Sequence, residues 1–162
     1  MSRTIKIVPL TKEAFAPFGD VIEADGAAQF QINQGYGLRY NDLGMVDIAT
    51  EGGATNVSFI IGSVRPQPIA LKVMERHPLG SQIFYPLQDQ HWLVVVCGDP
   101  EDFASYRAFE ATGRQGVNYA RNVWHHPLLV LENESRFFVV DRKGPGNNLE
   151  EHWMSGEDLF LP

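Results

Sequence analysis

Two short stretches of the chain hold the side chains that could bind a metal ion or move a proton. Glu75 and His77 stand two residues apart in a predicted strand, so both project from one face, about 6.5 Å apart along the strand. Gln82 begins the next predicted strand after a short turn, and His125 follows 48 residues after His77. Carboxylate and amide oxygens and imidazole nitrogens are competent ligands for a borderline divalent ion. Glu75 and His77 could therefore meet one metal ion, and Gln82 could be a further ligand.

The spacing alone leaves a second interpretation open. A glutamate and a histidine two apart on an antiparallel strand also form ordinary surface ion pairs, which contribute little to stability and carry no chemistry. The sequence around these residues therefore decides between a metal centre and an ion pair.

The two stretches resemble the cupin pattern in their order and spacing. The first cupin motif carries H-x-H and then a glutamate and a proline on two strands, and the second carries a lone histidine. Glu75 stands at the first of these histidines, His77 at the second, Gln82 at the glutamate and His125 at the histidine of the second motif. Two of the four ligand positions differ from the cupin residues.

Longer strings of sequence resemble a particular family. Residues 75–82, which read ERHPLGSQ, and residues 116–128, which contain GVNY and RNVWHHPL, are similar to ureidoglycolate lyases, also called ureidoglycolate hydrolases. Weaker similarity covers residues 18–23, Arg39-Tyr40 and Asp141-Arg142, so the resemblance spans nearly the whole chain. Residues 143–148 are less typical of the family and are interpreted as a loop.

This resemblance implies a cupin-like homodimer that cleaves (S)-ureidoglycolate to glyoxylate and urea with a divalent metal, often given as nickel. The implied metal ligands are Glu75, His77, Gln82 and His125. The implied catalytic residues are His77, His125, His126 and Glu75, with Glu75 or His126 carrying the proton if it is not bound to the ion. The older family name implies a hydrolase that releases ammonia instead. A non-catalytic cupin that binds a small acid or sugar, and a metal-free isomerase with one histidine as base, remain alternatives.

The implied substrate carries a carboxylate and a ureido group, and each needs a partner. A guanidinium pairs with a carboxylate through two bonds, and the candidates are Arg39, Arg121 and Arg142, of which Arg39 is favoured. Asn122 could hydrogen-bond the ureido group, and Tyr119 is either pocket wall or core. For each arginine, a solvated surface role is the alternative.

The elements that must position these residues are mostly short strands. Apolar runs rich in Val, Ile, Phe and Tyr are separated by Gly, Pro, Asn and Asp, which is typical of antiparallel strands. Strands are predicted at residues 4–8, 20–23, 29–33, 45–48, 56–61, 69–76, 82–85, 92–97, 128–132 and 136–141. Helices are predicted at residues 12–16, with Thr11 as N-cap, and at residues 99–111, and residues 132–135 are predicted to connect a hairpin. The predicted fold is all-β with a few short helices, a cupin-like antiparallel barrel or sandwich in one domain over residues 1–162.

Composition narrows the classes of partner. The net charge of −7 argues against a nucleic-acid partner, because that affinity comes largely from cationic side chains. No segment approaches the length of a membrane span and no signal peptide is recognised, so no membrane partner and a cytoplasmic location are expected. The single cysteine, Cys97, lies in an apolar run and is expected to be an inert core residue. The expected partners are a small-molecule substrate and a second copy of the chain.

Overall fold

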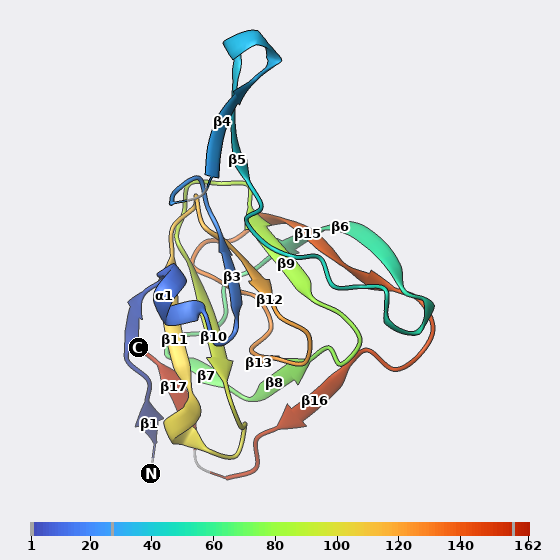
Figure 1. Cartoon of the computed structure of the whole chain (residues 1–162). Helices are drawn as coiled ribbons and strands as arrows, with labels where there is room; N and C mark the ends of the chain where they lie inside the picture. The colour runs from blue at the N-terminus through green and yellow to red at the C-terminus, as the bar shows by residue number, and fades with distance from the viewer. Residues whose placement is uncertain (1, 27, 157) are drawn as a thin grey trace.

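The computed structural model describes residues 2–26, 28–156 and 158–162 and consists mainly of β-strands in four sheets (Figure 1). The three-stranded sheet has the order β1 (Arg3–Thr4), β17 (Leu159–Leu161), β7 (Ile69–Leu71). The seven-stranded sheet has the order β16 (Glu150–Trp153), β8 (Val73–Arg76), β13 (Trp124–His125), β10 (Trp92–Cys97), β11 (Arg107–Ala111), β2 (Ile7–Pro9), and β14 (Leu129–Val130) also pairs with β10. The five-stranded sheet has the order β3 (Gly19–Ile22), β12 (Gly116–Tyr119), β9 (Gln82–Pro86), β15 (Ser135–Lys143), β6 (Ala54–Gly62). The all-β, cupin-like prediction is confirmed.

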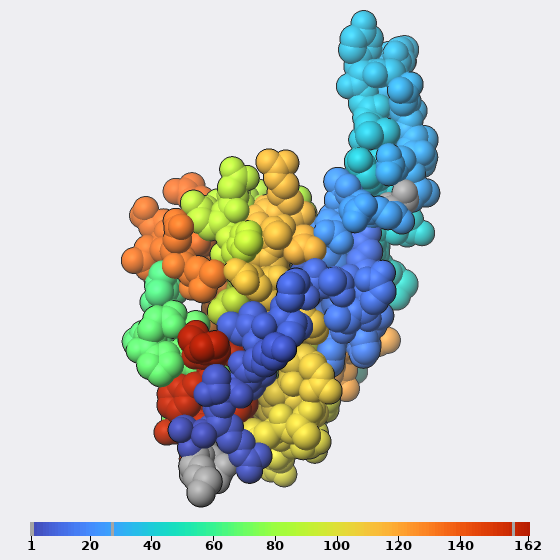
Figure 2. Space-filling model, turned by 90° about the vertical axis from the view of Figure 1, so that its left-hand side faces the viewer, coloured from blue at the N-terminus to red at the C-terminus, as the bar shows by residue number. Residues whose placement is uncertain are grey.

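Short helices and one hairpin complete the described chain. The α-helix α1 (Lys12–Phe15) begins as predicted at Thr11, whose side chain accepts a hydrogen bond from the Ala14 amide. Three 3₁₀ turns are η1 (Asn33–Gly35), η2 (Thr50–Gly52) and η3 (Phe103–Ser105). Strands β4 (Ala28–Ile32) and β5 (Gly37–Asn41) pair only with each other and project beyond the rest of the molecule (Figures 1 and 2). We call residues 28–41 the hairpin arm.

Strand β10 holds the layers together because both of its faces are buried. Trp92 and the alternate residues after it pack with Phe137 of the five-stranded sheet. Leu93 and its alternates pack with Leu71 of the three-stranded sheet. Cys97 ends the strand and is buried as predicted, and burial raises the pKa of its thiol to about 12. The continuous apolar run of β10 is thus explained by contacts on both faces.

The predicted helix at residues 99–111 is wrong. Asp99 and Asp102 accept hydrogen bonds from backbone amides two residues ahead, which makes tight turns and the short η3 instead of a helix. Residues 107–111 form β11, which pairs antiparallel with β10, Trp92 lying opposite Ala111. The capping signals were real, but pairing with the central strand overrides helix propensity beyond them.

The predicted strand boundaries also needed correction. Residues 45–48 form no strand, since Asp47 makes its backbone hydrogen bonds with Ser81 and not with a ladder. The predicted strand 69–76 is divided at Lys72 between two sheets, and residues 4–8 fall into β1 and β2. Strands β1 and β2 each pair in parallel with a neighbour, whereas the other pairs are antiparallel.

The predicted hairpin at residues 132–135 is wrong as well. Strand β14 before the turn pairs with β10, and β15 after it pairs with β6 and β9, so the turn joins two sheets. The sequence prediction also did not include the strands at residues 37–41, 107–111, 116–119, 124–125, 150–153 and 159–161.

Candidate active site

Strand pairing brings the first three predicted ligands together. Glu75 of β8 lies directly opposite His125 of β13, and His77 follows β8 by one residue. His125 Nε2 lies 3.4 Å and His77 Nε2 lies 3.9 Å from Glu75 Oε1. One donor atom from each residue lies within 4.8 Å of the other two, so the three could hold a metal ion. We call these three residues the histidine cluster.

Backbone carbonyls decide which nitrogen of each imidazole faces the cluster. His77 Nδ1 lies 2.8 Å from the Asn148 carbonyl oxygen, and His125 Nδ1 lies 3.0 Å from the Val123 carbonyl oxygen. A carbonyl oxygen can only accept, so each Nδ1 carries the proton and donates it. Each Nε2 then presents a lone pair to the cluster, and both Nε2 atoms are buried without a hydrogen-bond partner. This is the tautomer in which histidine binds a metal through Nε2.

The charges of the cluster suit a cation. Burial raises the pKa of Glu75, but His125, His77 and His126 together lower it by more. The pKa of Glu75 therefore lies below its ordinary value. Burial, followed by the neighbouring His125, lowers the pKa of His77. Glu75 is therefore an anion and His77 a neutral imidazole near pH 7. Lone pairs and a negative charge converge with no donor among them, which fits a divalent ion.

Gln82, the fourth predicted ligand, lies beside the cluster on the first residue of β9. It stands opposite Tyr119 in the sheet, and the Tyr119 ring stacks on His125 with centroids 4.1 Å apart. Gln82 Nε2 donates to Asp141 Oδ2 at 3.1 Å, while Gln82 Oε1 is buried without a partner. The structure thus brings all four predicted ligands into one region.

His126 lies behind the cluster. Its Nδ1 donates to the Pro127 carbonyl at 2.7 Å, and its buried Nε2 has no partner. Glu75, His125 and His126 line a small internal cavity with Tyr119 and apolar side chains. Burial lowers the pKa of His126 to about 4, so this imidazole is neutral near pH 7 and its Nε2 can accept a proton. Burial raises the pKa of Tyr119 above its ordinary value, so the phenol stays protonated.

Two predicted substrate-binding residues, Arg142 and Asn122, form hydrogen bonds with backbone carbonyls. The buried Arg142 guanidinium donates to the carbonyl oxygens of Thr50, Glu51 and Pro145, which leaves it engaged with main chain. Asn122 has a φ of 69°, and its amide donates to the His77 carbonyl at 2.9 Å. The exposed Asn122 thus holds the chain at His77 through its backbone.

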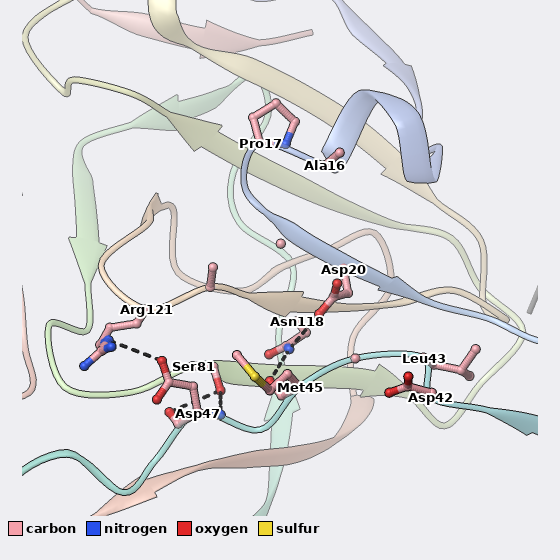
Figure 3. Close-up of a pocket in the computed structure, with 13 residues that line it drawn as sticks. Ala16, Pro17, Asp20, Asp42, Leu43, Met45, Asp47, Ser81, Asn118 and Arg121 are labelled. Atoms are coloured by element: carbon pink, nitrogen blue, oxygen red, sulfur yellow. Dashed lines mark hydrogen bonds and ion pairs between the residues drawn. The ribbon is translucent and has the colours of Figure 1, made fainter.

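Arg121 faces a different place, a surface hollow of about 420 Å³ on the outer side of β12 (Figure 3). Its Nε lies 3.3 Å from Asp47 Oδ2, and its Nη1 donates to Thr50 Oγ1. Asn118 Nδ2 donates to Asp20 and to the Met45 carbonyl in the same hollow. Tyr119 is the next residue of β12 after Asn118, so its side chain points the other way, toward the cluster. We call this hollow the outer hollow.

Arg39 lies on β5 of the hairpin arm, away from the cluster of its own chain (Figure 1). Among the described residues, nothing forms a hydrogen bond or ion pair with its guanidinium. Phe30, Tyr36 and Leu38 on the same arm are exposed, Tyr36 at 94%. The arm therefore presents apolar side chains and one unengaged cation to its surroundings.

Sequence reasoning missed three residues that act on the cluster. Asn148 lies in the segment interpreted only as a loop, yet its carbonyl orients His77 and its side chain accepts from the Leu79 amide. Asp141 was noted only for its place beside Arg142, but its partners are Gln82 and Asn56. The charge of Arg65 acts on His126 and contributes to its lowered pKa. The turn-forming residues before Asn148 were the one available signal.

Comparisons with known proteins agree on one family. The sequence profile described as ureidoglycolate lyase matches residues 2–159. Ureidoglycolate lyase 1 of Rhizobium meliloti (strain 1021) is 55% identical over 152 residues, which cover 93% of this chain and 89% of the relative. Ureidoglycolate lyase of Pseudomonas syringae pv. tomato (strain ATCC BAA-871 / DC3000) is 50% identical over 153 residues, 93% of this chain and 90% of the relative. That of Pseudomonas putida (strain W619) is 47% identical over 161 residues, 98% of this chain and 96% of the relative.

Proposed function

The chain belongs to the ureidoglycolate lyase family, and from this premise we propose that it cleaves (S)-ureidoglycolate to glyoxylate and urea. The observation that carries the proposal is the convergence of Glu75, His77 and His125 with their acceptor atoms facing one point. An ion pair on the surface, the alternative left by the spacing, does not explain buried nitrogens without partners.

The substrate sets out what the site must do. One carbon of ureidoglycolate carries a hydroxyl, a carboxylate and the ureido nitrogen. The hydroxyl loses its proton, its oxygen forms the carbonyl of glyoxylate, the carbon–nitrogen bond breaks, and the nitrogen takes up a proton to give urea. No water is consumed, and no nucleophile is needed. The reaction requires a proton acceptor, a proton donor and a group that holds the carboxylate.

We propose Glu75, His77, Gln82 and His125 as the ligands of a divalent metal, with nickel as the ion. Bound there, the ion would supply Lewis-acid polarisation of the substrate's oxygens. The two Nε2 lone pairs, the Glu75 carboxylate and the unpaired Gln82 Oε1 fit this donor set.

His126 is the proposed proton carrier. Its neutral imidazole has a free Nε2 lone pair inside the cavity that it shares with Glu75. The Nδ1 proton is tied to the Pro127 carbonyl, so Nε2 is the atom that accepts the hydroxyl proton and returns it to the leaving nitrogen. Tyr119 walls the cavity and keeps His125 in place by stacking.

Arg39 is the proposed partner of the substrate carboxylate, and this requires a homodimer. The arm carries Arg39 away from its own cluster, and no described residue engages its guanidinium, so it is available to a neighbouring copy. A two-stranded hairpin is marginally stable alone in water, and its exposed Phe30 and Leu38 favour a covering surface. Val57 and Phe59 on the outer side of β6 are also exposed, and a two-fold pair of chains would cover both surfaces at once.

We also propose a domain organisation, a ligand and a cellular location for the chain. The whole chain acts as one domain, its small-molecule ligand being ureidoglycolate, with no nucleic-acid or membrane partner. Among the described helices, none has the length and apolar character needed to cross a bilayer. The one cysteine is a buried free thiol, which agrees with the proposed cytoplasmic location.

The test is a product assay with purified protein and (S)-ureidoglycolate. The proposal expects one glyoxylate and one urea for each substrate consumed, with no ammonia, because the urea carbonyl is never attacked. Stoichiometric ammonia would establish the hydrolase alternative. Binding of substrate without any product would establish the non-catalytic cupin, and full turnover after exhaustive removal of metal would favour the histidine-base alternative.

A further inference from the structure

We infer that Asp141 is a positioning residue, which holds the Gln82 amide so that its oxygen and not its NH₂ group faces the metal centre. The inference deepens the proposed function, since it rests on the metal centre proposed there. It concerns a residue that contacts neither substrate nor metal and acts through Gln82.

The two ends of an amide side chain have nearly the same shape, so their partners decide the orientation. The Asp141 carboxylate can only accept hydrogen bonds, and it lies 3.1 Å from Gln82 Nε2. The NH₂ end must therefore point to Asp141, which leaves Oε1 at the other end. Gln82 is 8% exposed, so no bulk water can take over this choice.

The strand register places the Gln82 side chain on the face of the sheet that carries the histidine cluster. Residues directly opposite each other in a sheet project from the same face, and Gln82 lies opposite Tyr119, whose ring stacks on His125. Asp141 also lies close enough to His77 to act on its pKa. The Gln82 side chain therefore lies near both the carboxylate and the cluster, and the end that Asp141 does not hold is its unpaired Oε1.

A second strand pair fixes Asp141 itself. Asn56 of β6 lies opposite Asp141 of β15, and Asn56 Nδ2 donates to Asp141 Oδ1 at 3.0 Å. The other carboxylate oxygen, Oδ2, is the one that accepts from Gln82. Each oxygen has one donor, so the carboxylate cannot rotate without losing a partly buried hydrogen bond.

Reversal of the amide would damage the centre directly. The NH₂ group would then meet the bare Nε2 atoms of His77 and His125 and could donate to their lone pairs. A ligand oxygen would be lost, and the lone pairs that bind the metal would be occupied. Asp141 prevents this arrangement by giving the NH₂ group a stronger, charged acceptor.

The experiment measures Ni²⁺ affinity by calorimetry, without substrate, in a double-mutant cycle. Asp141→Asn gives Gln82 a partner that can also donate, and it should weaken Ni²⁺ binding about 10- to 100-fold, as loss of outer partners of metal ligands does. Gln82→Met removes the oxygen at similar volume and should weaken binding to a similar extent. If Asp141 acts through Gln82, the double variant should bind no more weakly than Gln82→Met alone.

Matched variants separate this role from charge and folding. Asp89→Asn makes the same charge change at an exposed site beside Arg114 and should leave Ni²⁺ affinity unchanged. If Asp141→Asn does not fold, Asn56→Ala keeps the carboxylate but frees one oxygen, and it should weaken binding severalfold. The Co²⁺ absorption spectrum should change in Asp141→Asn and in Gln82→Met in the same direction.

Three outcomes would overturn the inference. The first is Ni²⁺ affinity in folded Asp141→Asn equal to that of the wild type, and the second is an Asp141→Asn effect that persists in full in the Gln82→Met background. The third is wild-type protein that binds no Ni²⁺, which removes the metal centre and this inference with it. Product formation by the wild type is measured separately, so failure of the lyase assignment remains distinguishable.

Discussion

The histidine cluster and the outer hollow lie on opposite sides of one strand, β12, and differ in how their polar atoms are satisfied. Tyr119 points to the cluster and Asn118 to the hollow. In the hollow, Arg121 pairs with Asp47, and the NH₂ group of Asn118 has two acceptors. In the cluster, the Nε2 atoms face a carboxylate with no donor among them.

The largest volume and the most buried atoms without partners lie in different places in this molecule. The hollow measures about 420 Å³, whereas the cavity beside the cluster measures about 10 Å³. Buried acceptors without partners cost free energy, so a fold keeps them where a ligand completes them. Among the described residues, the hollow keeps one such atom, Asn118 Oδ1, whereas His77, His125, His126 and Gln82 in and beside the cluster hold four.

The largest loss of activity is expected when His125 of the histidine cluster is replaced. His125→Ala removes one Nε2 lone pair and should lower kcat for glyoxylate release roughly a thousandfold. Ni²⁺ content after dialysis should fall with it, while the thermal unfolding transition confirms that the variant is folded. Retention of more than a tenth of wild-type activity in a folded variant would contradict the role of the cluster.

A smaller loss is expected at His126. His126→Gln removes the proposed proton acceptor but none of the proposed ligands, so kcat should fall roughly a hundredfold with Ni²⁺ affinity unchanged. Stopped assays of glyoxylate give kcat, and calorimetry gives the affinity. A parallel loss of Ni²⁺ binding would make His126 a ligand and not the proton carrier.

Arg39 lies in neither the histidine cluster nor the outer hollow of its own chain, so its substitution tests whether a second chain completes the site. Arg39→Ala should lower kcat/KM by about 2 kcal/mol, roughly thirtyfold, because a charge-assisted pair with the carboxylate is lost. Equal amounts of Arg39→Ala and His125→Ala chains are then unfolded and refolded together. Half of the dimers formed are mixed, and one of the two sites in each mixed dimer is intact, so about a quarter of wild-type activity should be restored.

These measurements also show which arginine binds the substrate carboxylate if Arg39 of the neighbouring chain does not. Unchanged kcat/KM in Arg39→Ala would move this role to Arg121, Arg142 or Arg65. A loss in Arg39→Ala without restoration on mixing would place Arg39 at the site of its own chain.

The smallest effect is expected in the outer hollow. Asp47→Asn breaks the partly exposed pair with Arg121 but keeps the backbone hydrogen bonds to Ser81. The free energy of unfolding should fall by less than about 1 kcal/mol, measured by urea denaturation, with kcat unchanged. A large loss of kcat would show that the hollow takes part in the reaction and would end the contrast drawn above.

The fold could be predicted where local pattern and tertiary pairing agree. The apolar run of β10 and the Thr11 cap both appear as expected. At residues 99–111 they disagree, because Asp99 signals a helix start while the apolar residues after it belong to a strand beside β10. The pairing partner lies far away in sequence or across a turn, so a local pattern contains no record of it.

The site was predictable as a set of residue types and not as a network. Spacing and resemblance predict Glu75, His77, Gln82 and His125 as ligands, because their side chains carry the ligand atoms themselves, and the structure brings the four into one region. Asn148 acts on His77 chiefly through a carbonyl, and Asp141 acts through an amide, so neither has a recognisable spacing. Arg142 was expected at the substrate because a free guanidinium suits a carboxylate, yet three carbonyls already occupy it.

Main-chain carbonyls hold the Nδ1 atoms of His77, His125 and His126, and this has an evolutionary consequence. A carbonyl oxygen is present at every position, whatever side chain is attached. Residue 123 can therefore vary among descendants of this protein without loss of the tautomer that His125 requires, provided the chain keeps its path. At such a position the backbone path is retained while the side chain changes. A search for invariant side chains would therefore not detect the partner of His125.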